Sequence, residues 1–395
     1  MRSTLLVLLM MGTILGQRSP LDSAWDLVSK GQRDKAVALL QELIRTEPRN
    51  GDARLLLGSL LSEQGKLDEA LQQLKEAAGL LPDSAEAHNA LGEGLHSAGE
   101  IEASRPEFEK AVRLNPKLAQ AQCNLGMVLG ELGELPAAAG HLDAAIKLMG
   151  STEEAAVSHY FRAKVYTQEG RTDKAMAELD IALKLKPGLA AAWSDLGQAR
   201  KSQQDDAGAL AAFERSVSLD PDDAAAQARL GAEYLHRKQA HQAVAHLERA
   251  LQLDPADQTA LFNLQIALRQ DGREEEARDV SAKLAALIQR KDQGLQNNLT
   301  ANRLNNEGVK LQQAGDLRGA LAKYSAAHEL NPDSELFLFN MAVTLLRVGR
   351  WKEGLAALDE CRARDPNNAK LKAVWDDAIR QAPPGSWVAA APSHP

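Results

Sequence analysis

The sequence lacks the motifs that most often carry catalytic chemistry. Its 395 residues contain no HExxH, no GxSxG, no paired CxxC and no glycine-rich phosphate loop. Basic charge is also scarce, because 46 lysines and arginines stand against 54 aspartates and glutamates, for a formal net charge of −8. We therefore expect a protein that is not an enzyme, needs no cofactor and has no nucleic-acid partner, which would require clustered positive charge.

Histidine is also rare, and its spacing does not indicate a metal site. His236, His241 and His246 recur every five residues. That spacing does not place them on one face of a helix, as metal ligands at i and i+4 would be. We expect solvated surface histidines and no bound metal.

Proline, in contrast, follows a regular pattern. Eight of the fifteen prolines are separated by 34 residues within three groups: Pro48, Pro82 and Pro116; Pro187, Pro221 and Pro255; Pro332 and Pro366. A 34-residue period is typical of stacked helix pairs. The composition, 44% hydrophobic but only 4% aromatic, agrees with an all-helical chain.

Each repeat can be numbered by calling its proline position 32. Unit starts then fall at residues 17, 51, 85, 119, 156, 190, 224, 258, 301 and 335. Position 8 is small, which lets two helices approach, in Gly58, Gly92, Gly126, Ala163, Gly197, Gly231, Gly308 and Ala342. Large side chains recur at position 24, and position 15 carries a glycine in eight units, where the first helix of each pair, helix A, must end.

Short polar side chains follow several of the prolines. Ser84, Asp223, Ser334 and Asn368 stand where they can accept hydrogen bonds from the free amides at the start of the next helix. The proline itself ends the second helix of each pair, helix B, because it cannot donate a hydrogen bond. These signals predict both ends of the helices.

At this point the chain resembles the tetratricopeptide repeat family over residues 17–382. The residues that carry the resemblance most completely are Trp193, Leu196, Gly197, Ala209, Phe213 and Pro221. The resemblance implies an all-α, right-handed superhelical solenoid of about ten helix-turn-helix units with a C-terminal capping helix. Each unit would bury its apolar face only against its neighbours.

Two irregularities in the proline spacing predict that the repeat array is divided into blocks. Pro116 and Pro187 are 71 residues apart, three more than two repeats, and Pro255 and Pro332 are 77 apart, nine more. We interpret the second as a lengthened helix B followed by a polar joint. The expected organisation is 17–150 for units 1–4, 156–291 for units 5–8, 292–300 for the joint, 301–366 for units 9–10, 367–382 for the capping helix and 383–395 for a flexible tail.

The first 16 residues form a different kind of segment. Arg2 precedes an apolar stretch from Leu5 to Leu15, which is the pattern of a secretory signal peptide. We expect an exported protein, periplasmic or secreted. Cys123 and Cys361 lie far apart along the array, so we expect no disulfide between them.

The resemblance also implies a concave groove that binds peptide or protein partners, lined by positions 2, 5, 9, 12 and 13 of each helix A. Counting these positions assigns acidic residues to units 2–4, namely Asp52, Glu63, Glu86, Glu93 and Glu131. Units 5–8 contribute Lys164, Lys201, His236 and Arg269. Such polarity would orient a charged peptide. An ordinary scatter of surface charge is the alternative.

The last unit has apolar residues on both sides of its helix A. Leu336, Phe339, Val343 and Leu346 occupy groove positions, while Leu338, Met341, Ala342 and Leu345 already supply the core. Together with Phe262 and Ile266 of unit 8 and Val309 of unit 9, they predict an apolar patch at the C-terminal end of the groove. The alternative is that the tail, with Trp387 and Val388, covers them.

Asparagine recurs at position 6, as Asn124, Asn263, Asn306 and Asn340. In some members of the family such asparagines hydrogen-bond the backbone of an extended peptide, and three consecutive units here resemble that arrangement. The alternative is that they hydrogen-bond neighbouring helices, because buried amides must be satisfied.

The sequence thus favours a noncatalytic scaffold that binds a protein or peptide in its groove and reaches a membrane only by way of a partner. The alternative function is an accessory subunit that positions substrate for an envelope enzyme or for a secretion or assembly machine. A catalytic domain has no room, because no uninterrupted segment of about 50 residues remains outside the repeats.

Overall fold

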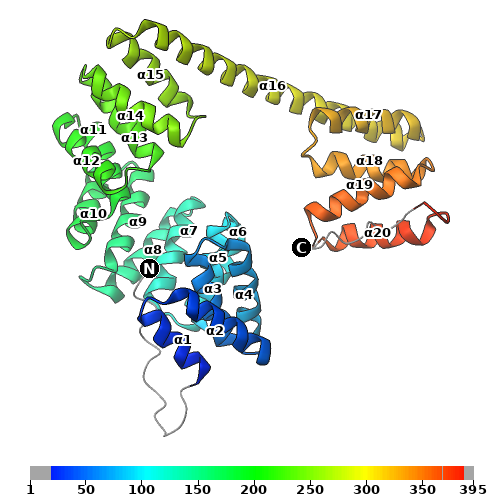
Figure 1. Ribbon diagram of the computed structural model, residues 1–395, viewed down its shortest axis with the longest axis horizontal. Helices are drawn as coiled ribbons and strands as arrows, with labels where there is room; N and C mark the ends of the chain where they lie inside the picture. Colours follow the sequence, from blue (N-terminus) through cyan, green and yellow to red (C-terminus); the bar gives the residue numbers. More distant parts are fainter. Residues whose placement is uncertain (1–18, 367, 387–395) are drawn as a thin grey trace. The chain divides into compact units, whose positions relative to one another are not determined.

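A computed structural model describes residues 19–366 and 368–386, and in this part of the chain every regular element is a helix (Figure 1). The predicted signal peptide, residues 1–16, and the tail residues Trp387 and Val388 lie outside the described residues. Among the described residues, no helix is both long enough and apolar enough to cross a membrane. The all-α prediction is confirmed.

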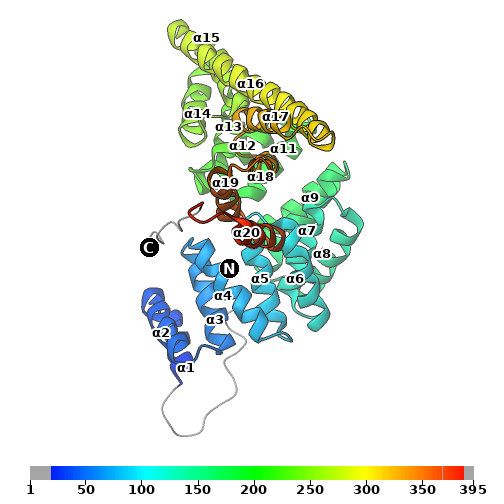
Figure 2. The same ribbon diagram turned by 90° about the vertical axis from the view of Figure 1, so that its right-hand side faces the viewer.

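The helices form two compact units that divide after Pro255. The first contains α1 Pro20–Ser29, α2 Arg33–Thr46, α3 Gly51–Glu63, α4 Leu67–Leu80, α5 Ala85–Ser97, α6 Ile101–Leu114, α7 Ala119–Glu131, α8 Leu135–Met149, α9 Ala155–Gln168, α10 Thr172–Leu185, α11 Ala190–Ser202, α12 Asp206–Leu219, α13 Ala224–His236 and α14 Ala240–Leu253. The second contains α15 Gln258–Gln270, α16 Glu274–Gln313, α17 Leu317–Leu330, α18 Glu335–Arg347, α19 Trp351–Arg364 and α20 Ala369–Gln381. Within each unit, helices that follow one another in the chain pack side by side (Figures 1 and 2).

The helix pairs close through the contact that the repeat predicts between positions 8 and 24. A Cβ atom added to Gly197 would lie 2.6 Å from Cε1 of Phe213, and one added to Gly92 would lie 2.6 Å from Cε1 of Phe108. Both phenylalanines are buried. Small residues at position 8 therefore allow the close approach of helices A and B, as predicted.

The helix ends also follow the predicted signals. Ser84, Asp223, Ser334 and Asn368 each accept a hydrogen bond from a backbone amide in the first turn of the following helix. The glycines at position 15 have positive φ values, for example 79° at Gly99. In units 6 and 7, where no glycine is present, Gln204 and Lys238 adopt the same left-handed conformation.

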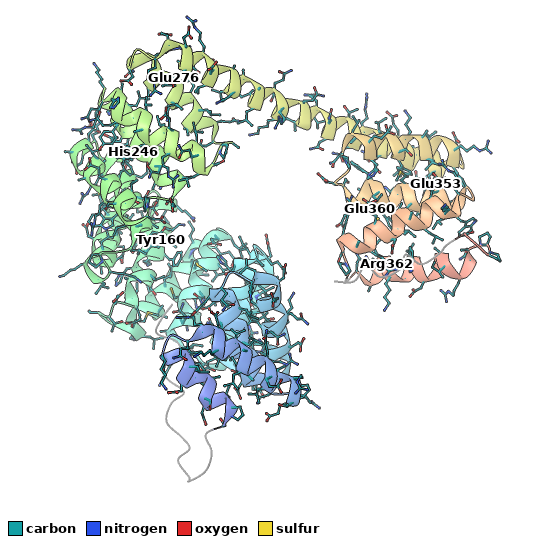
Figure 3. All side chains as sticks on the ribbon, viewed as in Figure 1. Tyr160, His246, Glu276, Glu353, Glu360 and Arg362 are labelled. Atoms are coloured by element: carbon teal, nitrogen blue, oxygen red, sulfur yellow. The ribbon has the colours of Figure 1, made fainter. Side chains whose placement is uncertain are left out.

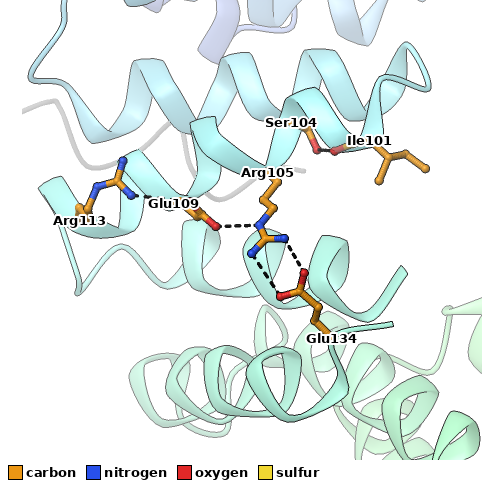
Figure 4. A network of polar contacts seen from close by, with 6 residues as sticks. All are labelled: Ile101, Ser104, Arg105, Glu109, Arg113 and Glu134. Atoms are coloured by element: carbon orange, nitrogen blue, oxygen red, sulfur yellow. Dashed lines mark hydrogen bonds and ion pairs between the residues drawn. The ribbon is translucent and has the colours of Figure 1, made fainter. Parts of the chain in front are cut away.

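Ionic contacts connect successive helix pairs of the first unit (Figure 4). Arg105 of α6 donates to Oε1 of Glu109 at 2.8 Å and, with two further nitrogens, to both carboxylate oxygens of Glu134 at 2.5 and 3.2 Å. Glu134 lies in the turn that precedes α8, in the next repeat. Such bidentate pairs add geometric specificity to the apolar stacking.

The structure differs from the predicted subdivisions at both irregular spacings. At the first, α8 packs against α9, so helix stacking continues across residues 151–155. At the second, residues 292–300 lie inside α16, a single helix of 40 residues, and no break separates the two repeats. The segment contains no proline, and Gly294 alone is too weak a signal to end a helix.

Cys123 and Cys361 are both free and buried, as the sequence analysis expected of cysteines that form no disulfide. Burial raises the pKa of each thiol to about 11. At neutral pH both thiols therefore stay protonated. The protonated thiol is neither the nucleophile nor the metal ligand, since the thiolate fills both roles.

The close contact within a repeat predicts opposite effects for two glycine substitutions. Gly197→Ala should destabilise the protein by about 1–3 kcal/mol, because the added methyl group overlaps Phe213. Gly140→Ala should stabilise it by about 0.5–1 kcal/mol, because Gly140 lies inside α8 with open space around it. Urea unfolding followed by circular dichroism would measure both. An unchanged midpoint for Gly197→Ala would contradict the packing account.

The buried thiols predict slow chemical modification. In the folded protein at pH 8, alkylation of Cys123 and Cys361 should be slower than in guanidinium-unfolded protein by at least about a hundredfold, because the thiolate fraction and the accessibility both fall. Mass spectrometry after a timed pulse of iodoacetamide measures this. Equal rates in the folded and unfolded protein would show that the thiols are open to solvent.

Candidate functional site

The first candidate surface is formed by the A helices of the first unit, and Asn124 lies at its centre. Asn124 is buried in α7, and its Nδ2 donates to Oδ1 of Asn89 at 3.0 Å and to Oε1 of Glu93 at 2.7 Å. Its Oδ1 accepts from Nε2 of Gln120 at 3.1 Å. These bonds occupy the amide, so Asn124 connects two repeats and is not available to a peptide ligand.

Several charges that the sequence places on these A helices are paired within the chain. Glu63 lies 2.7 Å from Arg33, and Glu131 lies 2.9 Å from His96. Lys164 stays exposed, with its ammonium nitrogen 5.8 Å from the centre of the Tyr160 ring. The charge that this surface offers to a partner is therefore smaller than the sequence suggests.

The structure also gathers a polar cluster at the turn between α11 and α12. Asp206, Glu233 and His236 each place one possible ligand atom within 4.8 Å of the others. Glu233 is fully buried, with 0% of its surface exposed, and Lys201 of α11 donates to one of its oxygens. The other oxygen, Oε1, has no hydrogen-bond partner among the described residues. The donor set would suit a divalent cation, but the ammonium of Lys201 already balances the buried carboxylate.

The spacing of the histidines relative to one another does not predict this cluster, because only one of them takes part in it. His246 instead places its Nδ1 2.8 Å from Oε1 of Gln227, and burial lowers its pKa. The available signal was the spacing of Glu233 and His236, which are three residues apart on one helix and therefore share a face. The contribution of Asp206, from the preceding repeat, has no local sequence signal.

The second candidate surface lies in the second unit, where the C-terminal part of α16 runs beside α18. Nδ2 of Asn340 donates to Oδ1 of Asn305 at 2.8 Å, and Oγ1 of Thr344 donates to Oε1 of Gln312 at 3.3 Å. The asparagine bond repeats the one between Asn124 and Asn89, at an identical separation of 35 residues. Asn124 and Asn340 thus hydrogen-bond neighbouring helices. This is the alternative to binding the backbone of a peptide.

Several side chains of this surface remain open. Leu336 is 56% exposed, Asn306 is exposed, and Val309, Phe339 and Val343 are partly buried. We call the surface made by Asn306, Val309, Leu336, Phe339, Asn340 and Val343 the α16–α18 face. It contains two of the four predicted asparagines and most of the predicted apolar patch.

Phe339 packs in part against the cluster formed by the last helices, and the remaining residue of α18, Leu346, packs inward against the same cluster. It contacts Gly354 of α19, where an added Cβ would lie 2.7 Å from its Cδ2. It belongs to a cluster with Leu358 and Trp375, which attaches α20 to the array. The guanidinium of Arg362, which is labelled in Figure 3, lies 4.7 Å from the centre of the Trp375 ring. Part of the predicted patch is therefore covered by the chain's own last helices.

The structure separates Phe262, Asn263 and Ile266 from this face. All three belong to α15, whose extensive contacts within the second unit are with α16 alone. The α16–α18 face lies at the other end of α16 (Figure 1). The prediction of a single patch that joins these residues to Leu336 and Phe339 is wrong, because α16 continues as one helix of 40 residues where a turn would have brought the next helix A back beside α15.

Comparisons with known proteins agree with this architecture. A curated relative, the tetratricopeptide repeat domain-containing protein PYG7 of Arabidopsis thaliana chloroplasts, is 41% identical over 49 residues, or 12% of this chain and 16% of that protein. A solved tetratricopeptide repeat protein from Parabacteroides merdae is 18% identical, with a TM-score of 0.51, and the match covers 63% of this chain and 97% of that one. For pilF of Pseudomonas aeruginosa the identity is 19%, the TM-score 0.47 and the coverage 56% and 96%. At 18% identity, the Parabacteroides merdae structure shows a likeness of fold alone.

Family models give the assignment directly. Three models of the tetratricopeptide repeat match the chain: one at residues 27–93 and 311–374, a second at 89–150, 123–190 and 160–224, and a third at 224–257. They cover well over half of the sequence and include both compact units. On this match and on its paired helices, the chain belongs to the tetratricopeptide repeat family.

Proposed function

We propose that the protein binds a protein or peptide partner through the α16–α18 face. Tetratricopeptide repeats are protein–protein interaction modules and in general noncatalytic, and this chain is a scaffold built of them. The observation that carries the proposal is the exposure of Leu336 beside Phe339 and Val343. Apolar side chains exposed in a group are typical of binding surfaces.

The opposite side of α18 supports this interpretation. Leu338, Ala342 and Leu345 are buried and already supply the contacts that hold α18 in the array. Leu336 and Val343 are therefore not needed for stacking, and a partner's apolar side chains would remove them from water. Burying a leucine of this kind contributes about 1.5–3 kcal/mol.

The charges around the face favour an acidic partner. Arg303 and Lys310 of α16 and Arg347 of α18 are exposed. Lys323 holds the pKa of Glu307 below its usual value, and Arg303 and Lys310 add to this effect, so this carboxylate is already paired. Asp333 and Glu335, just before Leu336, are exposed acidic residues outside this group. We expect a ligand segment whose apolar residues are flanked by aspartate or glutamate, because complementary charge speeds and orients association.

We further propose that the chain is exported and that residues 1–16 are removed. The support is the sequence pattern of Arg2 followed by an apolar stretch from Leu5 to Leu15.

The proposed face predicts the effect of two exposed substitutions. After affinity capture from the native organism has identified a partner, Leu336→Glu and Val343→Glu should each weaken its binding at least about tenfold, which is roughly 1.4 kcal/mol. Ile181→Glu is the matched control, since Ile181 is also exposed but lies on α10 of the first unit. Circular dichroism should be unchanged in all three variants. If the Leu336→Glu variant and the control bound the partner with equal affinity, the α16–α18 face would not be the binding site.

Export predicts a shortened N-terminus. When the full chain is expressed with a C-terminal tag in a bacterium with a periplasm, N-terminal sequencing of the tagged protein should find a start close to Gln17. Recovery of tagged protein that retains Arg2 and remains with the cytoplasmic fraction would contradict export.

A further inference from the structure

The middle of α16 exposes an unusual number of large apolar side chains. Ile288 is 44% exposed, and Leu295 and Leu299 are each 57% exposed. The buried residues of α16 lie near its two ends: Ala277 and Val280 on one side, and Ala301, Asn305 and Gly308 on the other. Between them, among the described residues, no helix of the same unit packs extensively against α16 (Figure 1), although Asn331 at the end of α17 donates to Oδ1 of Asn298 at 2.8 Å.

These side chains form two rows along the helix surface. Leu284, Ile288 and Asp292 are four residues apart in one row, and Lys291, Leu295 and Leu299 are four apart in the next. We call these six residues the α16 stripe. Leu284, Ile288, Lys291 and Leu295 are spaced four, three and four residues apart, which is the pattern that packs along its length against a second helix at a shallow crossing angle of about 20°.

The two halves of the α16 stripe are complementary about its middle. Reversal about a point between Lys291 and Asp292 exchanges Leu284 with Leu299, Ile288 with Leu295, and Lys291 with Asp292. In a symmetric dimer residue i contacts residue j and residue j contacts residue i, so an antiparallel pair centred at this point would match apolar residues with apolar residues and Lys291 with Asp292.

We propose that α16 forms an antiparallel homodimer through this stripe. Ile288 of one copy would pack against Leu295 of the second, and Leu284 against Leu299. At the twofold axis, Lys291 of each copy would face Asp292 of the other. Both residues are exposed, and neither forms an ion pair within the described part of the chain. A parallel pair would instead place Lys291 beside Lys291, which is repulsive.

The surroundings of the stripe suit a second copy of the same helix. Between residues 284 and 302 the only charged side chains are Arg290, Lys291 and Asp292. Gln289 and Gln296 lie nearest to one edge of the stripe, while Gln293 and Asn297 lie on the opposite face of the helix and hydrogen-bond each other at 2.9 Å. Amide side chains can hydrogen-bond across an interface without the cost of burying a charge.

The length of the stripe limits the expected affinity of the dimer. The segment from Leu284 to Leu299 is about 22 Å long, and two helices crossing over this distance bury less than a standard interface. We therefore expect dissociation constants in the micromolar range, on the order of 10⁻⁶ to 10⁻⁴ M. This inference concerns a surface separate from the α16–α18 face and does not depend on the proposed function.

Charge exchange provides the sharpest test. Analytical ultracentrifugation of the mature chain over a wide concentration range should show a reversible monomer–dimer equilibrium. Lys291→Asp should weaken the dimer at least tenfold, because aspartates then face aspartates across the axis. The double variant Lys291→Asp with Asp292→Lys should restore it. Ile288→Glu should abolish it with unchanged circular dichroism.

A cysteine experiment tests the orientation of the two helices. Ile288→Cys and Leu295→Cys proteins should form a disulfide with each other when mixed, but not each alone, because only the antiparallel pair brings residues 288 and 295 together. Buried Cys123 and Cys361 do not interfere. A wild-type chain that stays monomeric at 10⁻⁴ M, a charge exchange without rescue, or disulfides in the Ile288→Cys sample alone would each overturn the proposal.

Discussion

The contact between a small residue at position 8 and a large one at position 24 determines the architecture of this protein. Gly92 lies against Phe108, Gly197 against Phe213, and Gly308 against Tyr324, each so closely that a methyl group would overlap the partner. Because each helix pair closes on itself in this way, the core is divided into small clusters along the chain. The faces of the A helices that do not enter these clusters remain available for binding.

Much of the fold follows from this repeat and was predictable from sequence. The register located the helix caps, such as Ser84 and Asp223, and the glycines with positive φ, because these signals are local and recur in every unit. The failures have a physical reason as well. Residues 292–300 were expected to form a joint, but nothing in that segment opposes a helix strongly enough to end one, and α16 continues through it.

The candidate site was predicted less completely, since it depends on contacts between repeats. Leu336 and Val343 were identified because the repeat register assigns them to groove positions of helix A, and both retain exposed surface. The hydrogen bonds of Asn124 to Asn89 and of Asn340 to Asn305 required the structure, as did the inward packing of Leu346. A one-sequence argument assigns a residue to a face but does not show which of its polar groups are already satisfied.

The two proposed surfaces together describe a bivalent scaffold. A dimer through α16 would carry two α16–α18 faces, so a partner with two binding segments would bind more tightly than either contact alone allows.

The scaffold role depends on the partner occupying the A-helix side of the second unit. Hydrogen–deuterium exchange with and without the captured partner tests it most directly. The account predicts slower exchange in α18 and in the last turns of α16, with α17 and α19 unchanged. Protection confined to the first unit would contradict it.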